Sequence, residues 1–342
     1  MDPAAAVHEP TPAPPDVIVN LQLLRGIAAA MIVVLHVLRQ FWGKPAVVAS
    51  LFAGVDIFFV ISGFIMVFVT ERRLQSPSAF LVDRAIRIIP IYWTFTLLLA
   101  AAQSTLPGLN TAAPTGAELV KSLLFVPYGA PPNYPPILFV GWSLNAEVVF
   151  YLLFALSLAV APGNARRWLV TAAGVAAVYL LAHLAPQGSG LRFYGQSIVL
   201  EFILGMALAY WRSAVRRIPA PLALALVIAG AAAIAALPAF VRAESTFLLF
   251  GVPGAAIVAG LIALEAHGRV APRALAVWGG AISYILYLTH PLVISAFGAV
   301  QAHIALLKTP GGTVATALSA LAAAFVFARL PTACSKSRCH AG

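Results

Sequence analysis

The chain has 342 residues, of which 61% are hydrophobic and 9% are charged, and its mean hydropathy is +0.94. This composition excludes a water-soluble globular domain, which needs more charged surface, and it is typical of a helical protein with many membrane spans. The net charge of +10 does not indicate a nucleic-acid binder, because the basic residues lie in short clusters between apolar stretches. The two cysteines, Cys334 and Cys339, predict neither a disulfide framework nor a thiol nucleophile inside the membrane.

The order of segments along the chain predicts one membrane domain with a tail at each end. Residues 1–19 are rich in proline and are expected to be disordered, residues 20–330 form the membrane domain, and residues 331–342 form a polar tail. The segment 117–127 is too short to cross a bilayer. The apolar stretches predict an all-α polytopic bundle of about ten transmembrane helices, at residues 21–39, 53–70, 88–106, 137–160, 168–185, 196–212, 219–238, 247–265, 275–298 and 312–330.

The distribution of lysine and arginine predicts the orientation of this bundle. If the first span starts in the cytoplasm, the cytoplasmic segments hold 15 of the 21 basic residues. The alternation holds from loop to loop, so both termini are expected in the cytoplasm.

The first span, Asn20 to Gln40, carries two ionisable residues, Arg25 and His36. A helix advances ~100° and ~1.5 Å per residue, so the two share a face to within about 20° and lie ~16 Å apart along the axis. Ionisable groups in a span usually face a protein interior or a cavity and serve a function. The alternative is that Arg25 anchors the helix end and His36 is a satisfied core histidine.

In this orientation, other polar residues fall in the outer halves of three further spans: Asp56, Trp142, Asn145, Glu147 and His290. A carboxylate beside a histidine orients the imidazole, so Asp56 is the expected partner of His36. The alternatives are that Asp56 is a helix N-terminal carboxylate and that His290 is a packing residue.

At the inner end of the third span, Arg84 and Arg87 lie three residues apart on one face. Guanidinium groups pair with phosphate, and the alternative is that the two residues only fix topology. Ser62 precedes Gly63 and is interpreted as a packing residue, because no G-x-S-x-G turn supports a nucleophile. The CSKSRCH tail has poor spacing for metal ligands, so no metal site is predicted.

Five segments in register resemble the integral-membrane acyltransferase 3 family, whose members O-acylate extracytoplasmic glycans and some other acceptors from acyl-CoA. The segments are the Arg25–His36 pair, FFVISGF at 58–64 after Asp56, FLVDRAIRIIPIY at 80–92, WSLNAEVVFY at 142–151 and SYILYLTH at 283–290. The similarity covers residues 20–330 and is greatest to members that decorate bacterial exopolysaccharide. One departure is the C-terminal end, ARLPTACSKSRCHAG, which lacks the glutamate of the family's usual Glu-basic-Pro segment.

The resemblance implies an O-acyltransferase of the bacterial inner membrane that moves an acyl group from acyl-CoA to a hydroxyl of a cell-surface or exported polysaccharide. Acetyl is the expected group and succinyl the alternative. Acyl-CoA is a co-substrate, and no bound cofactor or metal is implied. The implied partners are membrane lipid and a free or lipid-linked glycan, not nucleic acid. The implied catalytic residues are His36, Asp56 and Glu147, and the implied substrate-binding residues are Arg25, Arg84, Arg87, Trp142, Asn145, Tyr287 and His290.

In the expected mechanism, Arg84 and Arg87 meet the CoA phosphates and Arg25 steers the pantetheine or pyrophosphate portion. His36 then takes the proton of an acceptor hydroxyl in the outer half of the membrane. One alternative from another class is a proton-coupled transporter or permease of a polysaccharide precursor, which also needs buried ionisable residues. A second is a haem protein with His36 and His290 as ligands.

Overall fold

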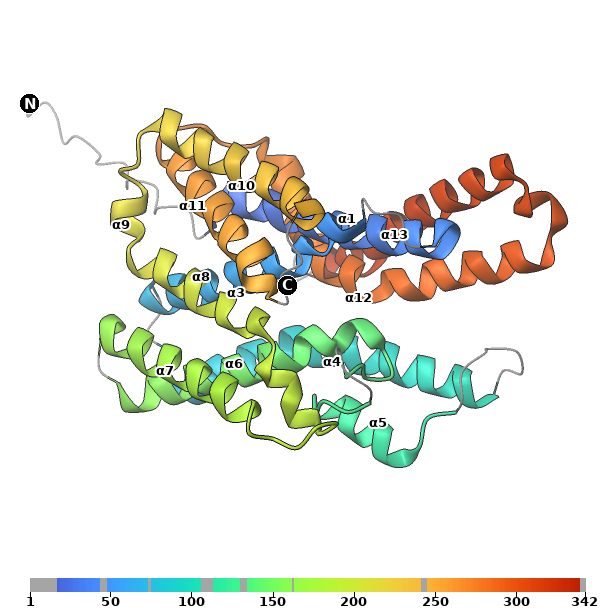
Figure 1. The fold of residues 1–342 in the computed structure, drawn as a ribbon, viewed down its shortest axis with the longest axis horizontal. Helices are drawn as coiled ribbons and strands as arrows, with labels where there is room; N and C mark the ends of the chain where they lie inside the picture. Colours follow the sequence, from blue (N-terminus) through green and yellow to red (C-terminus); the bar gives the residue numbers. More distant parts are fainter. Residues whose placement is uncertain are drawn as a thin grey trace, which may run out of the picture.

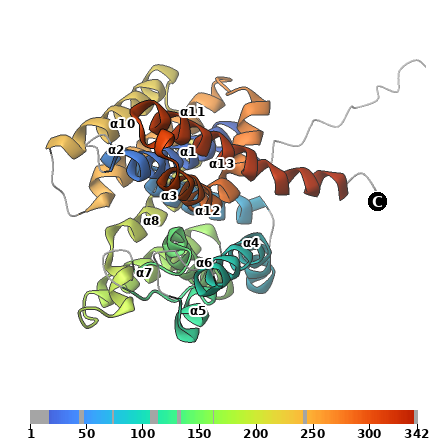
Figure 2. The same ribbon diagram turned by 90° about the vertical axis from the view of Figure 1, so that its right-hand side faces the viewer.

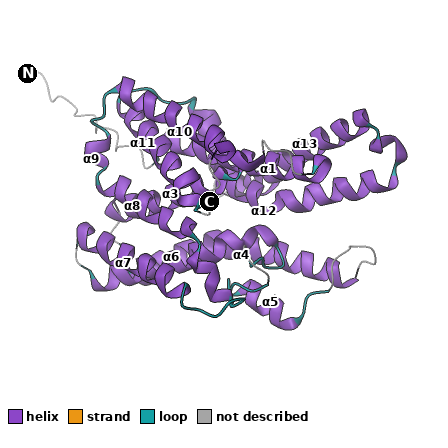
Figure 3. Cartoon of the chain, in the orientation of Figure 1, coloured by secondary structure: helices purple, strands orange, loops and turns teal. Residues whose placement is uncertain are grey.

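The computed structural model describes residues 17–43, 48–72, 75–105, 113–129, 134–161, 163–240 and 245–338. These residues form helices joined by turns and loops (Figure 3), which confirms the predicted all-α class. The elements in chain order are α1 Val19–Trp42, α2 Val48–Leu51, α3 Ala53–Arg72, α4 Pro77–Thr105, α5 Gly116–Leu123, η1 Phe139–Gly141, α6 Trp142–Val160, α7 Asn164–Ala182, η2 Gly190–Gly195, η3 Ser197–Leu200, α8 Glu201–Tyr210, α9 Arg212–Val215, α10 Ala220–Phe240, η4 Phe247–Gly251, α11 Val252–Ala266, α12 Arg273–His303, η5 Ala305–Lys308 and α13 Pro310–Arg338.

Nine helical runs in the described part of the chain are long and apolar enough to cross a membrane, and each coincides with a predicted span. The span predicted at 196–212 is a shorter apolar helix, Ser197–Tyr210, formed by η3 and α8. At ~1.5 Å per residue this helix reaches roughly 20 Å, less than the ~30 Å of a hydrocarbon core. The chain is therefore a multi-pass membrane protein in which one apolar helix is short.

Helix α3 lies at the centre of the bundle, where it packs against α1, α8 and α11 and has most of its residues buried. The ribbon diagrams show α1, α3 and α10 to α13 in one group and α4 to α7 in another, with α8 between them (Figures 1 and 2). Helices α12 and α13 form a long hairpin that projects from the first group (Figure 1).

Two glycines allow α3 and α8 to approach closely. A Cβ on Gly63 would meet the backbone of Phe202, and a Cβ on Gly205 would meet the backbone of Val60. Small residues favour such contacts between membrane helices, because association there depends on close packing rather than on the hydrophobic effect. The glycine contacts therefore fix which side chains of α3 and α8 face each other.

The long connection after α4 contains α5, which is too short to cross, as predicted. Thr115 and Glu118 form a capping box at its start: the Thr115 N–H donates to Glu118 Oε2 at 2.7 Å and the Glu118 N–H donates to Thr115 Oγ1 at 3.2 Å. At the chain ends, the predicted N-terminal tail falls largely outside the described residues, and α13 continues as a helix beyond residue 330 to Arg338.

The packing of α3 on α8 predicts that Gly205→Ala destabilises the protein. The added methyl group would force the two backbones apart, which should lower the free energy of unfolding by roughly 1–3 kcal/mol. Gly311→Ala is the matched control, because a Cβ there meets nothing within 4 Å. Thermal unfolding in detergent should show a lower midpoint only for Gly205→Ala, and equal midpoints for the two variants would contradict the close packing.

Candidate active site

Different charged residues line two of the cavities between the described helices. The arginine cavity, about 270 Å³ in volume, is lined among others by Arg25, Ser62, Arg84, Arg87, Glu147 and Tyr151. The histidine cavity, about 970 Å³ in volume, is lined among others by His36, Arg39, Asp56, Trp142, Tyr179 and His183. Arg25 and His36 come from opposite halves of α1, so the two cavities lie toward opposite ends of the bundle.

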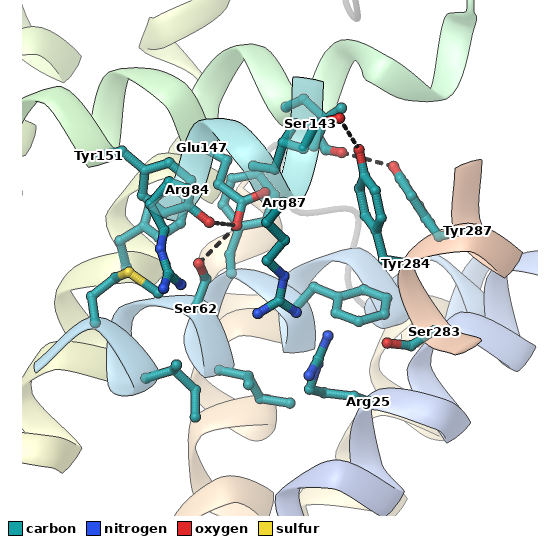
Figure 4. A pocket seen from close by; sticks show the side chains of 18 of the residues that line it. Arg25, Ser62, Arg84, Arg87, Ser143, Glu147, Tyr151, Ser283, Tyr284 and Tyr287 are labelled. Atoms are coloured by element: carbon teal, nitrogen blue, oxygen red, sulfur yellow. Dashed lines mark hydrogen bonds between the residues drawn. The ribbon is translucent and has the colours of Figure 1, made fainter. Parts of the chain in front are cut away.

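The arginine cavity gathers more positive than negative charge. Arg84 and Arg87 extend from α4 and Arg25 from α1 toward the same space (Figure 4). Arg25 donates to Gln22 Oε1 at 3.1 Å, and Glu147 is the carboxylate among the cavity's described lining residues. Three guanidinium groups and one carboxylate leave two positive charges without a countercharge in the lining. Because unpaired charge in a membrane is costly, such a cavity suits a ligand with several anionic groups, and phosphates match guanidinium geometry best.

Glu147 is held in this cavity by two hydroxyl groups. Ser62 Oγ donates to Glu147 Oε1 at 2.9 Å, and the Tyr151 hydroxyl donates to the same oxygen (Figure 4). The prediction that Glu147 joins His36 at one depth is therefore not met: Glu147 lies with the arginines instead. Ser62 does more than pack against a neighbouring helix, because it lines the cavity and holds the carboxylate.

The rings of His36 and His290 contact each other, with ring centroids 4.9 Å apart and His290 Nε2 3.2 Å from His36 Nδ1. His36 Nδ1 also lies 2.8 Å from the Ile32 carbonyl oxygen, and His290 Nδ1 lies 3.1 Å from the Leu286 carbonyl oxygen. A carbonyl oxygen only accepts hydrogen bonds, so Nδ1 carries the proton in each neutral ring. His290 Nε2 therefore accepts from His36 Nδ1–H, which leaves the lone pair of His36 Nε2 available as a base.

Asp56 lines the histidine cavity but is not the partner of His36. Its carboxyl group faces Glu201 of α8 and the hydroxyl of Thr246. No hydrogen bond joins Asp56 to His36 in the described part of the chain, where the side-chain partner of His36 is His290. The reason is rotational position: Asp56 is on the side of α3 that packs against α8, whereas His36 is on the side of α1 that packs against α12.

The two cavities meet at Val55 and Tyr287, which line both of them. The Tyr287 hydroxyl donates to the Val140 carbonyl at 3.0 Å and hydrogen-bonds to Ser143 Oγ at 2.8 Å. The Phe58 ring packs edge-on against Tyr287 with centroids 5.9 Å apart. The direct route from one cavity to the other therefore runs past a tyrosine ring that is held on several sides.

Of the remaining predicted residues, one lines a cavity and one is buried away from both cavities. Trp142 lines the histidine cavity, whereas Asn145 is only 1% exposed and is not part of the described lining of either cavity. Glu201 was not predicted, although a lone acidic residue in the apolar segment 196–212 is the same signal that singled out Glu147. The described residues contain no group of three or more histidine, cysteine or acidic side chains placed to hold a metal ion.

This fold defines a polytopic membrane protein with cavities between its helices that ionisable residues line. The acyltransferase domain family matches residues 18–329. The chain belongs to this acyltransferase family, as its motifs predicted, and it is therefore an enzyme that transfers acyl groups.

Two relatives extend the comparison. The chain is similar to "Exopolysaccharide production protein ExoZ" of Rhizobium meliloti (strain 1021), with 36% identity over 261 residues, which cover 71% of this chain and 76% of the relative. It is also similar to "Protein 2 in picA locus" of Rhizobium radiobacter, with 31% identity over 161 residues, which cover 42% of this chain and 83% of the relative. No solved structure matches the chain.

The contacts of the two rings predict the tautomers of His36 and His290. In the ¹⁵N NMR spectrum of histidine-labelled protein, at a pH where the rings are neutral, both should carry the proton on Nδ1, because each Nδ1 faces a carbonyl oxygen. Spectra of His36→Gln and His290→Gln identify the two sets of signals. Assignment of an Nε2–H tautomer to either ring would contradict the described arrangement.

Proposed function

We propose that this membrane acyltransferase moves an acetyl group from acetyl-CoA to a hydroxyl of a cell-surface or exported polysaccharide. The observation that supports this best is the difference in lining: three arginines and one carboxylate line one cavity, whereas His36 lines the other beside one arginine and one carboxylate. The two cavities meet at Val55 and Tyr287. A donor rich in phosphate and an acceptor rich in hydroxyl groups need such different surroundings. The similar protein ExoZ is named for exopolysaccharide production, which favours a polysaccharide acceptor.

In this proposal, acyl-CoA enters the arginine cavity from the cytoplasm. Both termini then lie in the cytoplasm, in agreement with the positive-inside rule, and the chain lies in the bacterial inner membrane. Arg87 is exposed and Arg84 half-buried, so the nucleotide end of the donor stays at the mouth of the cavity with its phosphates on these two side chains. A cavity of about 270 Å³ suits the narrow pantetheine arm, which passes Arg25 and brings the thioester toward Tyr287.

His36 acts as the general base of the transfer. Its Nε2 accepts the proton of the acceptor hydroxyl while that oxygen attacks the thioester carbon. The carbon–sulfur bond breaks, and the departing CoA sulfur takes the proton from the imidazolium, so one proton moves from hydroxyl to thiol. His290 Nε2 accepts the hydrogen bond from His36 Nδ1–H and holds the ring in the reactive orientation, the part that a carboxylate plays in other triads.

The histidine cavity has the size and lining that a sugar needs. Its volume of about 970 Å³ lies within the range of small-molecule sites, which is roughly 300–1,000 Å³. Trp142, Phe139 and Tyr179 supply apolar ring faces beside hydroxyl groups such as that of Ser245. In the proposed orientation this cavity lies toward the outer side, where a free or lipid-linked glycan can reach it.

The proposed role of the base predicts a large loss in His36→Ala. General-base catalysis contributes ~10²–10⁴-fold, so acetylation should fall by about that factor, and His36→Gln should be nearly as defective because an amide is not a base near neutral pH. The readout is the O-acetyl content of surface polysaccharide, by NMR or mass spectrometry, in a deletion strain that carries each variant at equal membrane abundance. His303→Gln, an exposed histidine at the end of α12, is the matched control and should remain active.

Normal acetylation in the His36→Ala strain would remove His36 from the mechanism. A deletion that changes no acyl group on any surface polysaccharide would overturn the proposed acceptor.

The proposed donor site predicts that Arg84→Ala combined with Arg87→Ala raises the KM for acetyl-CoA. A hydrogen bond to a charged group contributes about 1.5–3 kcal/mol, so the increase should be at least about tenfold even after screening by solvent. Arg166→Ala is the control, because Arg166 is an exposed basic residue of α7 outside the described lining of both cavities. An unchanged KM in the double variant would show that the two arginines serve topology alone.

A further inference from the structure

Two acidic side chains from membrane helices face each other beside the histidine cavity. Asp56, in the first turn of α3, is 2% exposed, and Glu201, the first residue of α8, is fully buried. The packing of α3 on α8 brings the two buried side chains together, and their carboxyl groups interact. The close packing of α3 on α8 brings together two like-charged residues that no family motif quoted above links.

The surroundings of this pair supply little compensation for negative charge. Neither carboxyl oxygen of Glu201 meets a hydrogen-bond donor among the described residues, and the same holds for Oδ1 of Asp56. The described donors to the Asp56 carboxyl are its own backbone N–H and the hydroxyl of Thr246, and no described lysine or arginine pairs with either carboxyl. The Glu201 carboxyl is packed against the π-helical turn η4, where a Cβ on Gly251 would lie 2.7 Å from Glu201 Oε1.

Two ionised carboxylates cannot remain in contact at such a position. Their repulsion grows as the dielectric constant falls, and neither can donate a hydrogen bond to the other while both are ionised. A single proton removes both problems, since one carboxyl then donates to the other and the pair carries one negative charge.

We propose that Asp56 and Glu201 bind one proton between them. This shared proton stabilises the packing of η4 against α3 and α8 beside the histidine cavity. Glu201 is a positioning residue in this account, because Asp56, Thr246, Leu249 and Phe250 line the cavity and Glu201 does not. Gly251 is needed at the end of the turn because a side chain there would displace the Glu201 carboxyl.

The consequence for activity rests on the proposed function. If the shared proton is lost as pH rises, the two carboxylates repel, the wall formed by Thr246, Leu249 and Phe250 moves, and binding of the acceptor weakens. The donor site is not part of this wall, so the KM for acetyl-CoA should change little. The other titratable or charged side chains that line the same cavity, and that contribute to any pH profile, are His36, Arg39, Tyr179, His183 and Tyr287.

The direct test is infrared spectroscopy of the purified full-length protein in lipid at neutral pH. A protonated carboxyl has a C=O stretching band apart from the carboxylate and amide bands, and the band shifts in D₂O. The difference between wild type and Glu201→Gln should contain this band, and the difference between wild type and Asp56→Asn should contain it too. If neither difference spectrum contains the protonated-carboxyl band, both carboxyls are ionised in wild type and the proposal is overturned. A band that appears in wild type only after Na⁺ is removed would also overturn it, in favour of a bound cation.

A second measurement separates the positioning role from a general loss of structure. Glu201→Gln should keep acetylation at neutral pH, because its amide donates permanently to Asp56, and should lose the decline that wild type shows at alkaline pH. Glu201→Ala and Gly251→Ala should raise the KM for the acceptor, while Gly311→Ala is the control because its Cβ would meet nothing within 4 Å. An alkaline decline in Glu201→Gln equal to that of wild type would contradict the role of the shared proton. If acetyl transfer is not detected in any variant or in wild type, the proposed function fails, whereas the infrared result stands independently.

Discussion

The structure depends on one constraint, the cost of placing charge inside a membrane. An ionised side chain in hydrocarbon needs a partner, a cavity or a ligand, and the chain meets this need by turning its ionisable residues toward the middle of the bundle. Helix α6 illustrates the arrangement: Glu147 and Tyr151 line the arginine cavity, whereas Leu152 and Leu156 are exposed on the outer side. The polar groups thus form an internal site, and the apolar residues form the surface that meets lipid.

Helix α3 divides this internal site into two parts. Ser62 of α3 belongs to the arginine cavity, Asp56 belongs to the histidine cavity, and Val55 lines both. Because α3 is buried between α1, α8 and α11, its side chains have fixed positions, and the separation between the two cavities is built into one rigid element. Helix α12 contributes in a similar way, because Tyr287 lines both cavities and His290 contacts His36. A donor and an acceptor held in these cavities would therefore meet at a defined point.

The sequence predicted the helices and the residue types of the site better than it predicted which side chains contact one another. Apolar length alone located nine spans, because a helix must cover the hydrocarbon core whatever it packs against. Depth along a helix could also be estimated, so Arg25 and His36 were correctly separated along α1.

The direction in which each helix turns its side chains could not be estimated, since it depends on packing between helices. For that reason Glu147 was grouped with His36 although it faces the arginines, and Asp56 was paired with His36 although it faces Glu201. Glu201 itself was available to the same reasoning, as an acidic residue within an apolar segment.

The central claim is that a donor enters through the arginine cavity and an acceptor through the histidine cavity, from opposite sides of the membrane. The measurement that tests it most directly uses sealed membrane vesicles of known orientation and radiolabelled acetyl-CoA, which does not cross the bilayer. Inverted vesicles, which expose the cytoplasmic face, should transfer label to polysaccharide, and right-side-out vesicles should do so only after permeabilisation. Equal labelling in intact vesicles of both orientations, or labelling only in intact right-side-out vesicles, would contradict the claim.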